Sequence, residues 1–347
     1  MQGKVMTVLG PIEPEILGVT LTHEHLLVDL RVWCEEPEEE EKKAFVKAPV
    51  EMPTLGAIRR EPFGNLDNCV LDDTALAVEE LQKFKKAGGS SVVDCTNNGL
   101  GRTPLALQEV AQAAEVNIVM GSGYYIGRSH PYDMADRSVE MIADEIEHDL
   151  MQGVEDTGVR SGLIGEIGTS FKVRENEQKV LRAAVRAQRS TGAPISVHLL
   201  PWQKNGIEVL EILESEGANP NQVILCHLSP TSGDVEYHTT LVKRGAYVEY
   251  DFFGMEFYVD SVGRYLGSDA ASVAALKRLI DAGCLERLLL SHDIAMKIQL
   301  TRYGGWGYAH LVKNVVPMLS RSGLSEEQIS TLIVENPRRV LTWGAPV

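Results

Sequence analysis

The stretch LTHEHLLVDL, residues 21–30, carries two histidines, His23 and His25, separated by one residue inside an apolar run. Imidazole side chains in such a setting can bind a metal ion or transfer protons, because a neutral ring offers a nitrogen lone pair and titrates near neutral pH. Side chains two residues apart on a β-strand point to the same side. The two histidines are therefore predicted to share one site.

Similar residue types end other predicted strands, at Glu166, His198, His227 and Asp293. A lone histidine in an apolar strand is more often a hydrogen-bonded core residue than a ligand. Several buried imidazoles and carboxylates at one depth are costly without partners, however, and a metal centre would satisfy them together. Nitrogen and oxygen ligands without thiolate favour Zn²⁺, with Mn²⁺, Co²⁺ or Fe²⁺ as alternatives. Six ligands exceed what one zinc takes, so two divalent ions are predicted.

These residues need a frame that gathers strand ends in one place. Eight short apolar runs alternate with amphipathic stretches that have apolar residues three and four apart. The pattern predicts an α/β fold, a (β/α)₈ TIM barrel with the binuclear metal centre at the C-terminal end of the strands. An open doubly wound sheet is the alternative, but it predicts a Gly-rich loop after the first strand, which this chain lacks. The predicted strands are 19–25, 90–96, 116–123, 161–168, 194–200, 222–228, 245–252 and 287–293, and the helices are 73–88, 104–116, 138–153, 177–192, 207–218 and 272–283.

Two regions interrupt the alternation. Residues 34–66 hold an acidic run, EEPEEEEKK, followed by a Pro-containing stretch, and are predicted to form an elaborated, solvated loop after strand 1. Residues 297–314 are rich in Gly and aromatic residues and suit a loop near the barrel mouth. No repeat or low-complexity linker is apparent, so residues 1–347 are predicted to form a single domain.

Composition excludes several classes of partner. The formal net charge of −16 argues against nucleic acid and anionic membrane surfaces. No apolar run is long enough for a membrane span, and the N-terminus lacks the pattern of a signal peptide. The five cysteines are scattered without a CxxC motif, which is typical of reduced thiols and predicts a cytoplasmic protein.

Longer motifs resemble a known family. The segments GKVMTVLGPIEPEILGVTLTHEH, GLIGEIGTS, HDIAMK, RYGGWGYAHLVKNVVP and VENPRRVL are similar to the phosphotriesterase family of the amidohydrolase superfamily, over nearly the whole chain except 34–66. The segment EYDFFG most resembles the phosphotriesterase-related branch, whose animal members hydrolyse N-acyltaurines. The resemblance implies that His23, His25 and Asp293 hold the more buried metal and that His198 and His227 hold the more exposed one. Glu166 stands where many relatives have a carbamylated lysine, and so would bridge the two ions.

The implied activity is that of a zinc-dependent hydrolase. A hydroxide that bridges the metals would attack a carboxylic ester, lactone or amide of a small-molecule substrate, with Asp293 as the catalytic proton acceptor. Tyr125, Phe252 and Trp306 are predicted to line the substrate pocket. Phosphotriesterase activity is an alternative, weakened because Pro230 lies where true phosphotriesterases have an aspartate. A non-catalytic barrel that binds a small molecule is another. His292, beside Asp293, is predicted to have a supporting role, and the chain is expected to form a homodimer.

Overall fold

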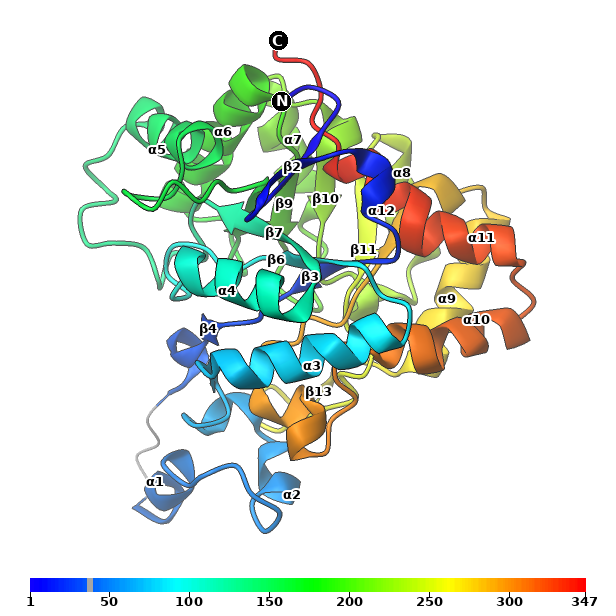
Figure 1. The fold of residues 1–347 in the computed structure, drawn as a ribbon. Coiled ribbons are helices and arrows are strands. Elements are labelled where there is room, and N and C mark those ends of the chain that lie inside the picture. Colours follow the sequence, from blue (N-terminus) through cyan, green and yellow to red (C-terminus); the bar gives the residue numbers. More distant parts are fainter. Residues whose placement is uncertain (36–39) are drawn as a thin grey trace.

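The computed structural model describes residues 1–35 and 40–347, and the side chains of residues 1–35 and 43–347. Its centre is an eight-stranded sheet in the order β14-β11-β10-β9-β8-β7-β6-β3, in which every neighbouring pair is parallel (Figure 1). The strands are β3 (Thr20–Glu24), β6 (Ser91–Asp94), β7 (Asn117–Ser122), β8 (Leu163–Gly168), β9 (Ile195–His198), β10 (Val223–Leu225), β11 (Tyr247–Tyr250) and β14 (Leu288–Leu290).

Side-chain and loop contacts bring the two ends of this sheet together. The Thr22 hydroxyl on β3 donates to the carbonyl of Leu290 on β14 at 3.4 Å, and the Asp293 amide donates to the carbonyl of His23 at 3.1 Å. The sheet is thus nearly closed, and the predicted (β/α)₈ barrel is confirmed over the open-sheet alternative. Each strand is followed along the chain by a helix, which gives the right-handed alternation of this fold.

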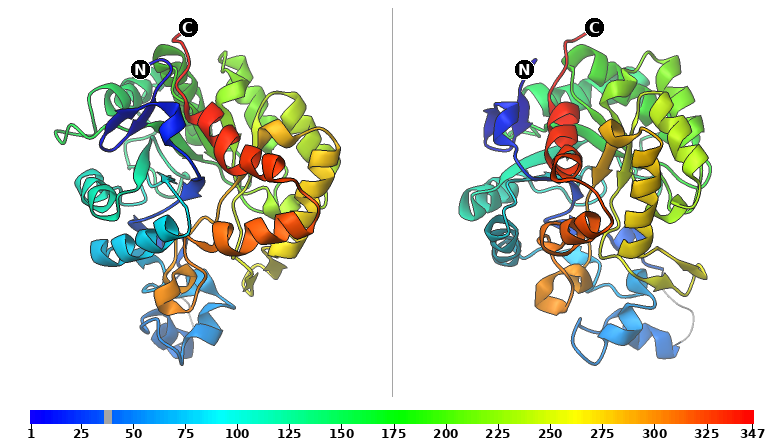
Figure 2. Two further views of the ribbon diagram at one scale, coloured as in Figure 1. Left: turned by 45° about the vertical axis from the view of Figure 1, so that its right-hand side comes forward. Right: turned by 90° about the vertical axis from the view of Figure 1, so that its right-hand side faces the viewer.

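Helices cover the strands on the outside (Figures 1 and 2). The barrel helices are α3 (Thr74–Lys86), α4 (Pro104–Ala114), α5 (Val139–Met151), α6 (Glu175–Thr191), α7 (Gly206–Ser215), α8 (Val235–Lys243) and α9 (Asp269–Asp281). All six predicted helices are present. Helix α8 was not predicted, because its sequence VEYHTTLVK is only nine residues long and four of them are β-branched, a type that favours strands. Three short helices end the chain, α10 (Val316–Arg321), α11 (Glu326–Ser330) and α12 (Asn336–Leu341).

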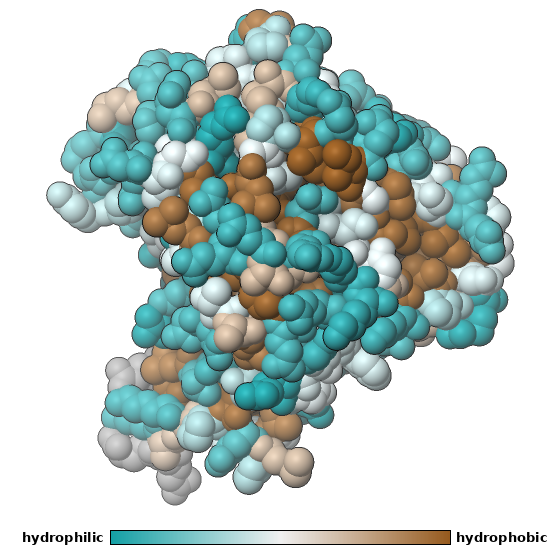
Figure 3. Space-filling model, in the orientation of Figure 1, coloured by the Kyte–Doolittle hydropathy of each residue, from teal (hydrophilic) through white to brown (hydrophobic). Residues whose placement is uncertain are grey.

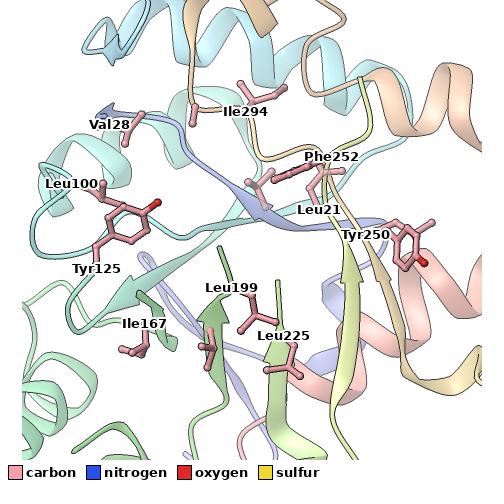
Figure 4. Packing of buried hydrophobic residues seen from close by; sticks show 14 of the residues in the cluster. Leu21, Val28, Leu100, Tyr125, Ile167, Leu199, Leu225, Tyr250, Phe252 and Ile294 are labelled. Atoms are coloured by element: carbon pink, nitrogen blue, oxygen red, sulfur yellow. The ribbon is translucent and has the colours of Figure 1, made fainter. Parts of the chain in front are cut away.

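The core has two parts, one on each face of the strands. Val92 belongs to a large cluster between strands and helices, whereas its neighbour Val93 belongs to a smaller cluster that also contains Cys95 and Cys226. Adjacent residues fall in different clusters because strand side chains alternate between two faces. In Figure 4, Ile167 and Leu225 come from separate strands of the large cluster. The smaller cluster fills the barrel below the predicted site.

The segment after strand β3 projects from the end of the molecule opposite the two termini (Figures 1 and 2). It holds two helices, α1 (Glu40–Val46) and α2 (Leu55–Ile58). Arg60 pairs with Asp260 in the loop after β11, and the Glu61 carboxylate accepts from the Ser261 amide and hydroxyl at 2.8 and 2.9 Å. The insert therefore joins the loops of the barrel mouth. Most of the predicted acidic run lies outside the described residues.

Three further short strand pairs and the surface complete the fold. No described helix has the length and apolar character needed to cross a membrane. The face drawn in Figure 3 is mostly hydrophilic, with separate hydrophobic patches, in keeping with the acidic composition. The single-domain organisation stays a prediction. The remaining strands are β1 (Val5–Thr7), β2 (Gly10–Ile12), β4 (Val28–Asp29), β5 (Val70–Leu71), β12 (Tyr258–Val259) and β13 (Arg264–Tyr265).

Candidate metal centre

His23 on β3 and His25, directly after its end, point to the same side, as their spacing predicts. The rings of His23 and His25 are 5.6 Å apart, and the two residues are 0% and 1% exposed. Glu24 between them points the other way. Its carboxylate accepts from the amides of His292 and Ile294 at 3.0 and 2.9 Å and fixes the segment after β14. The strand therefore directs both imidazoles into the barrel and uses the intervening residue as a structural clamp.

Three more predicted residues meet these histidines. Glu166 on β8 lies with its Oε2 atom 3.0 Å from Nδ1 of His198 and 3.4 Å from Nε2 of His227. Those two ring nitrogens are 2.8 Å from each other. The other oxygen of Glu166, Oε1, is 3.4 Å from Nε2 of His25. One carboxylate thus faces histidines from both sides of the barrel opening.

Asp293, after β14, completes the cluster. Its Oδ1 atom is 3.3 Å from Nε2 of His25 and 3.8 Å from Nε2 of His23, and its Oδ2 atom is 3.9 Å from Nδ1 of His227. Its side chain is 16% exposed, against 2% for Glu166. Asp293 therefore sits at the boundary between the buried cluster and the barrel mouth, where a substrate would approach.

Two of the six residues occupy strained backbone positions. His227 and Asp293 have φ values of 62° and 53°, in the left-handed region that L side chains rarely adopt. Such positions cost about 1–3 kcal/mol each and persist where the surroundings hold them, often at functional sites. The turn at His227 also ends β10 at Leu225, earlier than the predicted 228. These two backbone conformations direct the side chains of His227 and Asp293 toward the cluster.

Three supporting residues were not predicted. Thr96 lies with its hydroxyl 2.9 Å from Nδ1 of His25, and Asp251 has Oδ2 3.1 Å from Nδ1 of His227. Glu249 has Oε2 3.4 Å from Nδ1 of His23. The sequence did indicate the two acids, because they are charged residues two apart in the otherwise apolar run GAYVEYDF. Their partners could not be read from it.

The donor set fits divalent cations. His23, His25 and Asp293 can place one ligand atom each within 4.8 Å of one another, and so can His23, Glu166 and His227. Nε2 of His23 is buried without a hydrogen-bonding partner. Imidazole nitrogens and carboxylate oxygens without thiolate suit Zn²⁺ and its first-row neighbours. The orphaned Nε2 of His23 therefore lacks a bond that a metal ion would supply.

The electrostatics agree with this reading. Burial disfavours the ionised form of Glu166, but the imidazoles of His23 and His198 outweigh burial and hold its pKa well below the usual range. Burial likewise disfavours protonated His25, but Asp293 and Glu166 overcome it and raise the pKa of that imidazole to about 9. The carboxylates of the cluster are thus ionised and attract cations. In the described structure their ionic partners are imidazoles and not lysine or arginine.

Two of the predicted pocket residues adjoin the cluster. The Tyr125 hydroxyl lies 3.3 Å from Nδ1 of His198, and burial raises the pKa of that phenol well above its ordinary value. Phe252 stacks on His227 with ring centroids 5.0 Å apart. Phe252 follows β11, which ends at Tyr250, two residues earlier than the predicted 252. Figure 4 shows both aromatic residues among the loops and strands that carry the packed hydrophobic side chains.

Trp306 lies in a different setting. Its indole stacks on His310, with centroids 5.0 Å apart, and the residue is 58% exposed. An aromatic residue that was not predicted, Trp33, instead donates from Nε1 to the Tyr125 hydroxyl at 3.1 Å. Its ring is 6.3 Å from that of His198. His292 binds Glu24 at 2.6 Å, outside the cluster, as the alternation of the strand predicts.

The family of the chain follows from comparison with known proteins. A family model described as "Phosphotriesterase family" matches residues 3–341. The chain belongs to the phosphotriesterase family. Enzymes of this family are hydrolases that depend on a binuclear metal centre, and the cluster described above supplies a set of possible ligands.

Individual relatives are similar over their full length. An N-acetyltaurine hydrolase of Tetraodon nigroviridis is 37% identical over 346 residues, which cover 99% of this chain and 99% of the relative. The solved structure of a resiniferatoxin-binding protein from Rhodobacter sphaeroides is 43% identical, with a TM-score of 0.96, covering 99% and 97% of the two chains. A phosphotriesterase homology protein from Escherichia coli, complexed with phosphate in its active site, is 30% identical, with a TM-score of 0.78, covering 94% and 99%.

Proposed function

We propose that this phosphotriesterase-family protein is a binuclear zinc-dependent hydrolase that cleaves an amide, ester or lactone bond of a small molecule. The observation that carries the proposal is the position of Glu166, whose two oxygens face His25 on one side and His198 and His227 on the other. One metal would be held by His23, His25 and Asp293, and the other by His198 and His227, with Glu166 shared.

The residues of the chain have distinct parts in such a reaction. When bound, two divalent ions lower the pKa of a water held between them and polarise the oxygen of the bond to be cleaved. Asp293, the more exposed carboxylate, would take the proton of the attacking water and pass it to the leaving group. The Tyr125 hydroxyl accepts a hydrogen bond from Trp33 and lies 3.3 Å from Nδ1 of His198, and it would donate its proton toward a substrate oxygen when that nitrogen holds a metal.

Relatives favour the amide among the three bond types. Similar proteins are named N-acetyltaurine hydrolases, and acetyltaurine is an amide of an amino sulfonate. An N-acylated amino compound is therefore the substrate class we propose, with esters and lactones as further substrates. Phe252 and Trp33 form apolar walls near the cluster and suit the acyl group. Phosphotriester hydrolysis is an alternative activity, and the experiment below tests it.

Two remaining predictions concern the setting of the protein. The five cysteines are free thiols, which supports a reducing compartment such as the cytoplasm. A homodimer is the expected assembly. Both stay predictions, and size-exclusion chromatography with light scattering tests the second.

A second candidate function is binding without turnover. It is favoured by the Rhodobacter sphaeroides neighbour, which is named for its binding of resiniferatoxin. A binding module has no need for a catalytic carboxylate at the mouth of a metal cluster, so the Asp293 position speaks for hydrolysis. Isothermal titration with resiniferatoxin, together with assays for its cleavage, separates the two functions.

The decisive experiment uses the purified chain stripped by a chelator and reloaded with Zn²⁺, Mn²⁺, Co²⁺ or Fe²⁺. Turnover of N-acetyltaurine, an aryl ester, a lactone and paraoxon is measured before and after reloading. We expect close to two metal equivalents and restored amide hydrolysis. Full activity in the chelated protein, or one metal equivalent under metal-replete conditions, would contradict the binuclear mechanism. Turnover of paraoxon alone would reassign the substrate class.

A further inference from the structure

Strand β11 and the residue that follows its end carry two buried acids, Glu249 and Asp251. Both residues are 0% exposed. Because they are two apart, their side chains point to the same face of the strand, which is the interior face on which His23 lies. A buried carboxylate without a hydrogen-bond donor or a counter-charge is strongly unfavourable. Each of these acids therefore requires a partner within the barrel.

Asp251 has its donors. Its two carboxylate oxygens accept from the His227 amide at 3.0 and 2.9 Å. Its Oδ2 atom is also 3.1 Å from Nδ1 of the same histidine. Asp251 is thus hydrogen-bonded to the backbone of His227 and lies close to its ring.

Glu249 has no such bond. Both of its carboxylate oxygens are buried without a hydrogen-bonding partner among the described residues. The facing polar atom is Nδ1 of His23, 3.4 Å from Oε2, and that nitrogen also has no hydrogen-bonding partner. Asp251 is 3.5 Å from the same nitrogen, but it is already bound to His227. The thiol of Cys226, also nearby, has its sulfur 3.0 Å from the Ser196 hydroxyl.

We propose that Glu249 is a positioning residue that accepts the Nδ1 proton of His23. This inference rests on the proposed metal centre. An imidazole that keeps its proton on Nδ1 presents the lone pair of Nε2, and Nε2 is the atom that faces Glu166 and Asp293 at 3.6 and 3.8 Å. A carboxylate behind a ligand histidine fixes its tautomer and ring orientation and makes it a stronger donor. With Asp251 behind His227, β11 supports one histidine of each proposed metal.

The test measures zinc affinity and metal-free stability separately in Glu249→Leu and Glu249→Gln. In the Leu variant, zinc affinity by chelator competition is expected to fall by about 10- to 100-fold, the effect typical of losing such a partner. The Tm of the metal-free protein should stay the same or rise, because the desolvation cost of a fully buried carboxylate is removed. Glu249→Gln, which keeps an acceptor oxygen but no charge, should lose less affinity. The control is Glu80→Gln, a buried acid that binds Lys83 and Thr301, and its zinc affinity should not change.

A second readout follows the histidine itself. In spectra of ¹⁵N-histidine-labelled, zinc-loaded protein, the Nδ1-protonated form of His23 should be present in the wild type and diminished in Glu249→Leu. Wild-type zinc affinity in the Leu variant overturns the inference. If that variant does not fold, unchanged affinity in the Gln variant overturns it.

The stoichiometry gives an independent check. A third zinc equivalent that is lost on substitution of Glu249 overturns the inference, because His23, Cys226, Glu249 and Asp251 would then hold a metal of their own. A wild-type chain that binds no zinc contradicts the proposed function, and the inference falls with it. If the wild-type chain binds two zinc equivalents and both Glu249 variants keep the wild-type zinc affinity, the inference is overturned and the proposed function stands.

Discussion

The Oε2 atom of Glu166 lies 3.0 Å from Nδ1 of His198, whereas its Oε1 atom is turned to the opposite side of the barrel opening, toward His25. Gly165 before it has a φ of 128°, and a Cβ there would come within 2.2 Å of the Ser196 carbonyl oxygen. A glycine is required at that position for β8 to approach β9 so closely. The backbone and the neighbouring strand together set where this carboxylate lies.

Replacing Glu166 by Gln should remove metal. The amide keeps the shape of the side chain but loses the charge that attracts two cations. We expect the content of divalent metal to fall from close to two equivalents to one or less, and turnover to fall with it. Elemental analysis of the purified variant measures the first effect. Glu80→Gln serves as the matched control, and retention of two tightly held equivalents in Glu166→Gln would rule out the shared role.

Asp293→Asn should keep the fold and lose turnover. One oxygen of the amide can still contact a metal, but it cannot take a proton from the attacking water. A fall in kcat of about 10²- to 10⁴-fold is expected, the range of general acid–base catalysis. Steady-state kinetics on metal-loaded variant, with circular dichroism to verify folding, provide the measurement. Wild-type kcat with metals bound would show that another group accepts the proton.

Phe252 should set the preference for the acyl or alcohol part of the substrate. Its ring stacks on His227, so a side chain at this position reaches the edge of the cluster. Phe252→Arg is expected to shift the ratio of kcat/KM values toward polar lactones, and Phe252→Leu should leave that ratio close to the wild-type value. Competition assays with paired substrates measure the shift. An unchanged ratio in the Arg variant would place Phe252 outside the pocket.

The two tryptophans at the mouth allow a direct comparison. Trp33 hydrogen-bonds Tyr125, whereas Trp306 is 58% exposed and stacks on His310. We expect Trp33→Ala to raise KM by about fivefold or more, the scale of an aromatic contact worth about 1 kcal/mol. The rise in KM for Trp306→Ala should be smaller, with metal content unaltered in both. A larger effect at Trp306 would restore it as the principal pocket wall.

His238 should make stability fall in acid. It is buried on α8 between Thr231 and Tyr250, with Asp234 and Lys204 as the charged groups nearby, and burial lowers its pKa from 6.5 to about 4. Protons therefore bind the unfolded chain preferentially between these values. The contribution of neutral His238 to the free energy of unfolding is fully present above pH 6.5. It declines by about 3 kcal/mol as the pH falls to 4.

The check is urea unfolding of the wild type and His238→Gln at a series of pH values. The difference in the free energy of unfolding between the two proteins should shrink by about 3 kcal/mol from pH 7 to pH 4, since other acids titrate alike in both. A difference that is independent of pH would mean that the pKa of His238 is the same in the folded and the unfolded chain.

Much of the fold could be predicted because it rests on local periodicity. Eight apolar runs and six amphipathic stretches place the main strands and helices, since burial on one or both faces leaves a repeat of two or of three to four residues in the chain. The shared direction of His23 and His25 follows from the same alternation. Helix α8 was missed where that repeat is weak.

What the tertiary structure decided lies between distant parts of the chain. Trp33 reaches Tyr125, Asp251 reaches His227, and Glu249 reaches His23 only because the barrel closes and the loops at its mouth fold over one another. The left-handed turns at His227 and Asp293 likewise depend on surrounding packing. The residue types and spacing determined by themselves which side chains could form a metal centre. Closure of the barrel determined which atoms face each other, because those distances depend on strand pairing and not on separation along the chain.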